Sequence, residues 1–394
     1  MQCRTSKIKV FVLYLLSICT FFASLNQNIY TPAIPLIRDS FNVSINWVNF
    51  TVSSFIFIIA MIQIVLGMVI EAKNQKRLLL VSFVFISIST IICAFTTNFM
   101  LFMISRLVQA IGAGIIPLVT INMISQLFEG QARGSAMGTY QILLTLAPAI
   151  APILGGLLGQ YYGYQGIFLF LSVISAALFV FIAYILPNDE RKNSRRKTSC
   201  FVKNYIAVFS NYIGISTMVI SFFVFFIYFA ILVYLPVLLH DYYHISVQIV
   251  GLLYLPLTVS MILGSTLFKN LQKKISLNVL FMAILFFMPL QVVLFGVLHT
   301  KSIIGLSIIL FCYGMTVGFS APLFSTIISN EYIENRGTAL GLFNFIRYFG
   351  MTIGGMLTGL YSIISSSFVF FFLGSFLFLA SILQFRILKK SFLS

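Results

Sequence analysis

Charged residues are scarce in this sequence of 394 residues: Asp, Glu, Lys and Arg together make up 8% of it, whereas about a quarter of a typical soluble domain is charged. Hydrophobic residues make up 60% and include 43 Phe. A soluble protein cannot remove that much apolar surface from water, because about 55–60% of its own surface is already apolar. The composition therefore excludes a soluble protein and indicates an integral membrane protein.

Acidic residues are the scarcest charged group, with eight Asp and Glu against 24 Lys and Arg, and the formal net charge is +16. So basic a balance first suggests a nucleic-acid-binding protein. Cysteine is scarce as well, and the five Cys lie without the spacing of a metal or redox site. We therefore expect no metal and no cofactor. The distribution of the basic residues along the chain then tests whether the protein binds nucleic acid.

Long apolar runs make up most of the sequence. A helix that crosses a membrane needs about 20 mostly apolar residues, whereas barrel strands would show alternating segments of about ten residues. The runs in this sequence are continuously apolar, so the predicted fold is an all-α membrane protein with twelve transmembrane helices. The predicted spans are 10–37, 46–70, 78–97, 100–127, 135–160, 165–187, 208–238, 247–268, 277–298, 302–328, 337–361 and 367–387.

The first run resembles the start of a signal peptide, because Arg4, Lys7 and Lys9 precede it. The run continues through residues 26–28 into 29–37 without a convincing cleavage site. We therefore predict an uncleaved first helix.

The basic residues are distributed unevenly between the two ends of the spans. If the N-terminus is cytoplasmic, 20 of the 24 Lys and Arg fall in inner segments, and the outer segments hold only Arg38 and Lys301. Such an excess marks the cytoplasmic side, so both termini are predicted to be cytoplasmic in a multi-pass protein of the cell membrane. The densest group, at 191–203, is interpreted as a loop that faces anionic lipid and not as a nucleic-acid site.

An internal repeat divides the chain into two halves. Residues 133–138 (RGSAMG) open the fifth span and residues 336–341 (RGTALG) open the eleventh, 203 residues later. Two related six-helix halves with a site between them are typical of secondary transporters. The predicted domains are an N-terminal six-helix bundle (1–187), a basic cytoplasmic linker (188–207) and a C-terminal six-helix bundle (208–394).

Four motifs occur in order on the predicted helices: residues 28–35, 67–77, 106–114 and 147–156. Together they resemble the major facilitator superfamily, and within it the twelve-helix drug/proton antiporters, over nearly the whole chain. In the second motif Glu71 stands where the family usually has Asp. In the first motif Asn28 replaces a frequent acid.

The resemblance implies a conformational latch at the cytoplasmic ends of the helices. In the family this cluster is thought to hold the two halves in one state. Here it would comprise Gly67, Glu71, Arg77 and Arg133. An ordinary solvated turn is the alternative interpretation.

The resemblance also implies an antiporter bend in the fifth span. Pro148 and Pro152 remove backbone hydrogen bonds, and Gly155 and Gly156 allow close helix packing. In exporters of the family this bend seals a helix interface. A generic packing helix is the alternative.

Two arginines lie inside predicted spans, where a charge is a functional hypothesis by default. Arg106 has Gln109 three residues later, on nearly the same helix face, and Arg347 lies about ten residues into the eleventh span. A structural or snorkelling Arg is the alternative for each. The candidates for the substrate cavity are these three residues with Asn26, Asn28, Tyr30, Tyr140, Gln141, Tyr228, Tyr234, Tyr254 and Asn344.

No acidic residue lies in the middle of a predicted span, although a proton antiporter needs a group that titrates. Asp39 or Asp241, near outer ends, could couple protons, and Asp39 is slightly favoured. The alternatives are a proton bound to the substrate, or uncoupled transport.

A cavity with arginines and no buried acid disfavours cations. The predicted function is proton-coupled export of a small neutral, zwitterionic or anionic molecule, a drug or a metabolite, by a monomeric carrier driven by the proton motive force. The alternatives are export of an endogenous product, such as a metallophore or an amino-acid derivative, and import by symport or uniport.

An enzyme would need a convergent group of polar residues. All three His (His240, His244 and His299) fall in outer segments, and we expect no buried partner for any of them. His240 and His244 have a spacing that can bind metal on a helix. An interfacial loop is expected there instead, with a pH-responsive outer gate as a minor alternative. No catalytic residue is predicted.

Overall fold

The computed structural model describes residues 2–67, 74–128, 130–186, 211–332, 336–357 and 365–393. This part of the chain is helical and contains no strand, and every predicted span overlaps one or more of its helices. Nine helical stretches among the described residues are long and apolar enough to cross a membrane, and Ser366–Leu379 is a shorter apolar helix. The all-α membrane fold is therefore confirmed, and the helices are consistent with twelve spans.

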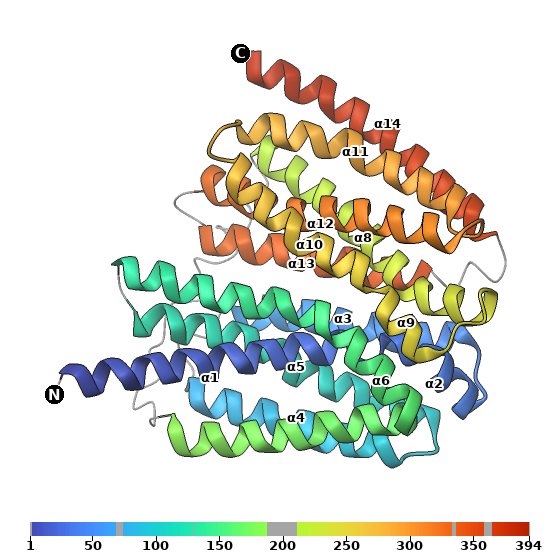
Figure 1. Cartoon of the computed structure of the whole chain (residues 1–394). Helices are drawn as coiled ribbons and strands as arrows, with labels where there is room; N and C mark the ends of the chain where they lie inside the picture. Colours follow the sequence, from blue (N-terminus) through green and yellow to red (C-terminus); the bar gives the residue numbers. More distant parts are fainter. Residues whose placement is uncertain are drawn as a thin grey trace. The chain divides into compact units, whose positions relative to one another are not determined.

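The chain divides into two compact units, of which the first comprises Met1–Thr198 and Leu235–Leu252. Within it, α1 packs on α5 and α6, α3 packs on α5, and α4 packs on both α5 and α6 (Figure 1). The helices of this unit are α1 (Gln2–Asn28), η1 (Thr31–Ala33), α2 (Ile34–Phe41), α3 (Ile45–Gly67), α4 (Gln75–Phe95), α5 (Phe99–Leu127), α6 (Gly130–Ile185), η4 (Leu238–Tyr242) and α9 (Val247–Leu253, but for its last residue).

The second unit comprises Ser199–Tyr234 and Leu253–Ser394. In it, α12 packs on α10, α11 and α13, and α11 also packs along α14. Its helices are α8 (Tyr212–Val237, up to Tyr234), α10 (Leu255–Leu271), α11 (Leu277–Leu298), α12 (Ile303–Glu331), α13 (Arg336–Leu357) and α14 (Ser366–Leu393). The predicted linker 188–207 lies outside the described residues. Residues 235–252 follow the linker in sequence, yet they pack in the first unit.

Polar caps start several of these helices where the sequence changes from loop to apolar run. The side chain of Asn98 accepts hydrogen bonds from the amides of Met100 and Leu101, and that of Asn74 accepts one from Arg77. Each cap satisfies an amide that has no partner inside the helix. The helices α4 and α5 therefore begin close to the predicted first residues of their spans.

Two predicted spans have breaks that the apolar runs did not reveal, namely 10–37, which is broken after Asn28, and 247–268, which is broken at Tyr254 between α9 and α10. The first span is helical to Asn28, continues as η1 and resumes as α2, with Pro32 and Pro35 in the first turns of these two elements. In α6 the fifth and sixth spans form one long helix that is broken only at Gly163, where φ is 65°. That φ favours glycine, so Gly163 marks the turn between the two spans.

Candidate functional site

Arg106 is completely buried in the first unit. It lies eight residues after the cap Asn98, which is about 12 Å along the axis of α5. Its guanidinium carbon is 3.9 Å from the ring centre of Tyr30 and 4.1 Å from that of Phe55. Aromatic faces stabilise a cation at such distances, so the two rings replace part of the solvation that Arg106 loses.

A short polar chain extends from Arg106 to the first helix. Arg106 Nη1 donates to Gln109 Oε1 at 2.7 Å, and Gln109 Nε2 donates to Asn26 Oδ1. Within the described residues, Arg106 Nε and Nη2 make no hydrogen bond, and no carboxylate forms an ion pair with Arg106. A buried guanidinium therefore retains two donor groups and a net positive charge.

Arg347 lies near the middle of α13, in the second unit. Its guanidinium carbon is 5.2 Å from the ring centre of Phe225 and 4.9 Å from that of Tyr348. Its Nε is buried and has no hydrogen bond among the described residues. Arg347 thus resembles Arg106 in having aromatic neighbours and no acidic partner within that part of the chain.

The other cavity candidates of the first unit are buried but engaged elsewhere. Asn28 Nδ2 donates to the carbonyl of Ser24 in its own helix at 2.9 Å, and the hydroxyl of Tyr140 donates to the carbonyl of Pro117 at 3.3 Å. The side chain of Gln141 lies outside the described residues. The structure therefore brings Tyr30 and Gln109 to Arg106 and gives Asn28 and Tyr140 structural contacts.

In the second unit, Tyr254 and Tyr234 also use their hydroxyls inside the protein. Tyr254 donates to the carbonyl of Leu232 at 2.7 Å, and Tyr234 donates to Ser366 Oγ at 2.8 Å. Tyr228 is buried, and Asn344 is half-buried in α13.

His299 corrects one expectation from the sequence, since it is buried and has polar partners. Its Nδ1 lies 2.8 Å from the carbonyl of Phe295, and its Nε2 lies 2.9 Å from Ser366 Oγ. Burial lowers the pKa of His299, and the hydrogen bond with Phe295 opposes this shift. Because a carbonyl can only accept, Nδ1 carries a proton, and the lowered pKa favours the neutral imidazole with this tautomer. The prediction that no His has a buried partner was wrong because α11 ends at Leu298, so that His299 packs under α14.

The antiporter bend places glycines of α6 against two other backbones of the first unit. A Cβ added to Gly155 would lie 1.6 Å from the carbonyl oxygen of Ile29, and one added to Gly156 would lie 2.9 Å from that of Val247. Gly251 of α9 also packs closely, because its Cβ would lie 2.5 Å from the carbonyl oxygen of Pro152. Pro148 is half-buried and Pro152 is buried, and both remain within helical backbone. Glycine is thus required by the close approach of α6 to Ile29, which directly follows α1, and to α9.

The predicted latch lies only partly in the described residues. Gly67 ends α3, and Arg77 is exposed in the first turn of α4. Glu71 lies outside the described residues, as does the side chain of Arg133. The latch therefore stays a prediction.

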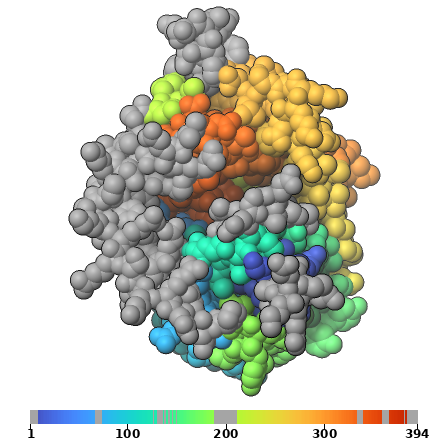
Figure 2. Space-filling model, turned by 90° about the vertical axis from the view of Figure 1, so that its left-hand side faces the viewer, coloured from blue at the N-terminus to red at the C-terminus, as the bar shows by residue number. Residues whose placement is uncertain are grey.

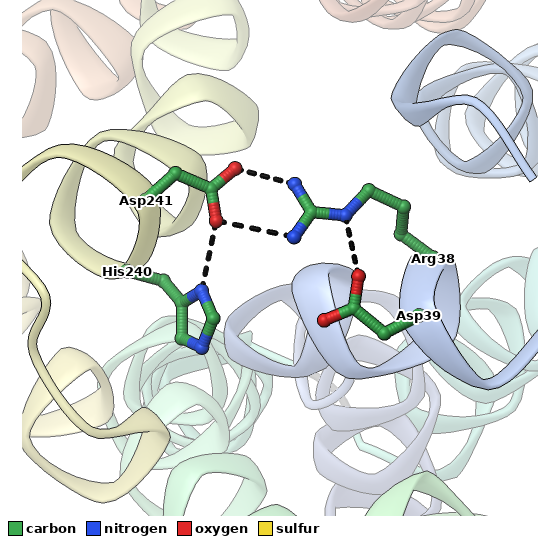
Figure 3. Close-up of polar contacts among 4 residues, drawn as sticks. All are labelled: Arg38, Asp39, His240 and Asp241. Atoms are coloured by element: carbon green, nitrogen blue, oxygen red, sulfur yellow. Dashed lines mark hydrogen bonds and ion pairs between the residues drawn. The ribbon is translucent and has the colours of Figure 1, made fainter. Parts of the chain in front are cut away.

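The two carboxylates considered for proton coupling meet at a single guanidinium (Figure 3). Arg38 Nε donates to Asp39 Oδ1 at 2.8 Å, while Arg38 Nη1 and Nη2 donate to Asp241 Oδ2 and Oδ1, the latter at 3.2 Å. His240 Nδ1 lies 2.8 Å from Asp241 Oδ1. The described residues hold no group of three or more His, Cys, Asp or Glu that fits a metal ion.

The sequence model of the Major Facilitator Superfamily matches residues 16–355. The chain is 25% identical over 187 residues to a protein of Aspergillus niger named citrate exporter 1, and this alignment covers 48% of this chain and 36% of that protein. It is 27% identical over 187 residues to the MFS antiporter QDR3 of Candida albicans, and this alignment covers 48% of this chain and 27% of that protein. The matched region thus spans about a third of the length of these curated relatives.

The fold is also that of a solved transporter. The crystal structure of a D-xylose-proton symporter superposes with a TM-score of 0.78 at 15% identity, over 95% of this chain and 96% of that chain. At that identity the likeness shows the fold alone.

Proposed function

Because the chain belongs to the Major Facilitator Superfamily, we propose that it is a proton-coupled exporter of a small neutral, zwitterionic or anionic molecule, a drug or a metabolite. It would work by alternating access in the cytoplasmic membrane, as a monomer with both termini in the cytoplasm. The names of two relatives, an exporter and an antiporter, support this direction.

The observation that carries the choice of substrate is the buried guanidinium of Arg106. Two of its N–H-bearing nitrogens have no hydrogen-bond partner in the described part of the chain, and no carboxylate there balances its charge. Buried donors without partners are costly, and an oxyanion or a carboxylate is the group that guanidinium binds best. A lipophilic cation would be repelled by Arg106.

The packing of Gly155 and Gly156 supports export, since this close approach of α6 to Ile29 and to α9 fits the sealing role that the resemblance assigns to the bend in exporters. Two alternatives are kept. An endogenous product such as a metallophore or an amino-acid derivative satisfies the same charge argument. Import by symport or uniport is the other alternative.

The proposal is tested with purified protein in liposomes and three radiolabelled probes: citrate, histidine and ethidium. We expect exchange of an anionic or zwitterionic probe, and we expect Arg106→Gln to reduce this exchange about tenfold or more, because a charge-assisted contact is lost. Lys301→Gln is the control, since Lys301 is exposed between α11 and α12. Uptake of ethidium driven by membrane potential, with no anion exchange, would contradict the proposal.

Direction needs a separate experiment. Inverted vesicles, in which the cytoplasmic face is outside, should accumulate the exported probe when their lumen is acidified. Accumulation only in right-side-out vesicles would favour the importer.

A further inference from the structure

The guanidinium of Arg106 has one edge without a hydrogen bond in the described part of the chain. Nη1 donates to Gln109 Oε1 at 2.7 Å, whereas Nε and Nη2 have no partner there. In a guanidinium, Nε and Nη2 lie side by side with their N–H bonds pointing the same way, as a fork. Because Arg106 is completely buried, this fork lies inside the first unit.

Aromatic rings surround the guanidinium of Arg106. Its central carbon lies 3.9, 4.1 and 5.7 Å from the ring centres of Tyr30, Phe55 and Phe168. These rings belong to the turn after α1, to α3 and to α6. A ring face attracts a cation, but it gives an N–H group no oxygen to bind. The rings therefore stabilise the charge of Arg106 without satisfying its fork.

The polar neighbours of Arg106 add a further donor. Gln109 accepts from Arg106 with Oε1 and donates to Asn26 Oδ1 with Nε2. This direction leaves Asn26 Nδ2 buried and without a hydrogen bond among the described residues. The hydroxyl of Tyr30, which can donate or accept, has no partner there either. In the chain Arg106–Gln109–Asn26, every side-chain atom without a partner is thus a donor.

No carboxylate of the described chain pairs with the fork. Three of the eight acids are described. Asp39 and Asp241 contact Arg38, and Glu331 ends α12 in the second unit. A buried charge is costly unless it has a partner of opposite charge. A ligand at Arg106 would therefore have to supply both a negative charge and hydrogen-bond acceptors.

We propose that the fork of Arg106 binds a small monovalent anion such as chloride or nitrate. An anion accepts from several donors at once and balances the charge, whereas water satisfies donors and leaves the charge unbalanced. Because Arg106, Asn26 and Tyr30 are all completely buried, the site suits an ion of few atoms. A planar oxyanion also matches the two parallel N–H bonds of the fork, as a carboxylate does.

The inference rests on the proposed function in one respect, because the anionic group of a substrate would use the same fork. The small anion would balance Arg106 when no substrate is bound, and the carboxylate of the substrate would displace it. The two ligands are then competitors. Chloride should therefore raise the KM for an anionic substrate and leave the maximal rate of its transport unchanged.

Equilibrium binding of radiolabelled chloride to the purified full-length protein in detergent measures the site directly, with no transported substrate present. Gluconate keeps the ionic strength constant, so that attraction to surface charges stays the same. Unlabelled nitrate and sulfate are added as competitors. We expect saturable binding of a single chloride per chain. Nitrate should displace it, and sulfate should be about tenfold less effective, because its second charge would be buried without a partner.

Two variants test the assignment to Arg106. Arg106→Gln should weaken chloride binding about tenfold or more, because charge-assisted hydrogen bonds are lost. Asn26→Asp keeps the shape of the side chain and an oxygen for Gln109 Nε2. Its carboxylate adds a negative charge two hydrogen bonds away from the guanidinium, so it should also weaken binding about tenfold or more. Arg347→Gln is the matched control, since it removes the other arginine inside a predicted span and should keep chloride binding.

Four results would overturn the proposal. The parent protein shows no saturable chloride binding, or sulfate competes as well as nitrate, which would indicate surface attraction. Asn26→Asp binds chloride as the parent does, or Arg347→Gln loses the binding that Arg106→Gln keeps. Exchange of an anionic probe that depends on Arg106, without chloride binding, would leave the proposed function standing. Chloride binding as expected, without exchange of any probe, would count against the proposed function and support the anion site.

Discussion

Tyr254 supplies the hydrogen bond that Pro236 takes away from α8. Proline has no amide hydrogen, so Pro236 leaves the carbonyl of Leu232, four residues earlier, without its helical donor. The hydroxyl of Tyr254 donates to that carbonyl at 2.7 Å. Leu232 and Tyr254 flank 235–252, the segment that packs in the first unit. The bond therefore joins the place where the chain leaves the second unit to the place where it re-enters.

Tyr254→Phe should therefore destabilise the protein. It leaves a buried carbonyl without a donor, which costs about 1–3 kcal/mol and cannot be offset by water inside a membrane. Thermal unfolding in detergent micelles measures the effect. Pro236→Ala restores an amide at that place, so the loss caused by Tyr254→Phe should be smaller in the Pro236→Ala background. Equal losses in both backgrounds would show that the hydroxyl does not compensate for the proline.

Gly155 should tolerate no larger residue. The Cβ of Gly155→Ala would lie 1.6 Å from the carbonyl oxygen of Ile29, so Ile29 and α6 must move apart, at a cost of about 1–3 kcal/mol or more. We expect a lower melting temperature and a lower yield of folded protein. Gly341→Ala is the matched control, because its Cβ meets nothing within 4 Å and alanine favours a helix. Equal melting temperatures for the two variants would contradict the close approach.

Lys76 should anchor the end of α6. Its Nζ donates to the carbonyls of Ala183 and Leu186 at 2.9 and 2.5 Å, and a cation at a helix C-terminus also interacts favourably with the helix dipole. The start of α4 and the end of α6 both reach the face shown in Figure 2. Lys76→Met should cost about 1–2 kcal/mol in thermal unfolding, whereas Lys274→Met, at an exposed site, should cost little. Comparable losses would mean that removing any basic residue destabilises the protein.

The sequence predicted the helices well because a spanning helix must be apolar along nearly its whole length. It did not predict the break between Asn28 and Ile34, or that residues 235–252 would pack with the first unit. Both depend on which backbones approach one another, and an apolar run is equally compatible with several partners. Arg106 and Gln109 were proposed as cavity residues because a charge inside a span is rare, and that role stays a prediction.

The group of charges around Arg38 was only partly predictable. Asp39 and Asp241 were noticed as acids near outer ends, but Arg38 was counted only as one of two basic residues outside. The signal that could have joined them is the match between 38–44 and 240–246, which is weak because Asp39–Asp241 and Ser44–Ser246 are its only identical pairs. His299 was misjudged because its burial depends on Ser366 and Phe370 of α14, and nothing in the sequence near His299 indicates them.

Stability should fall in acid because of His299. Burial lowers the pKa of His299 below the ordinary value of 6.5 in the folded protein, with the hydrogen bond to Phe295 opposing the shift. The unfolded chain therefore binds a proton first, and the stability that is fully present above pH 6.5 is lost as the pH falls from there towards the lowered pKa. Melting temperatures between pH 8 and pH 5 measure this slope. His299→Gln should flatten this slope. His244→Asn should keep it, because His244 is exposed and asparagine tolerates the left-handed backbone at that position. An unchanged slope in His299→Gln would assign the acid sensitivity to another group.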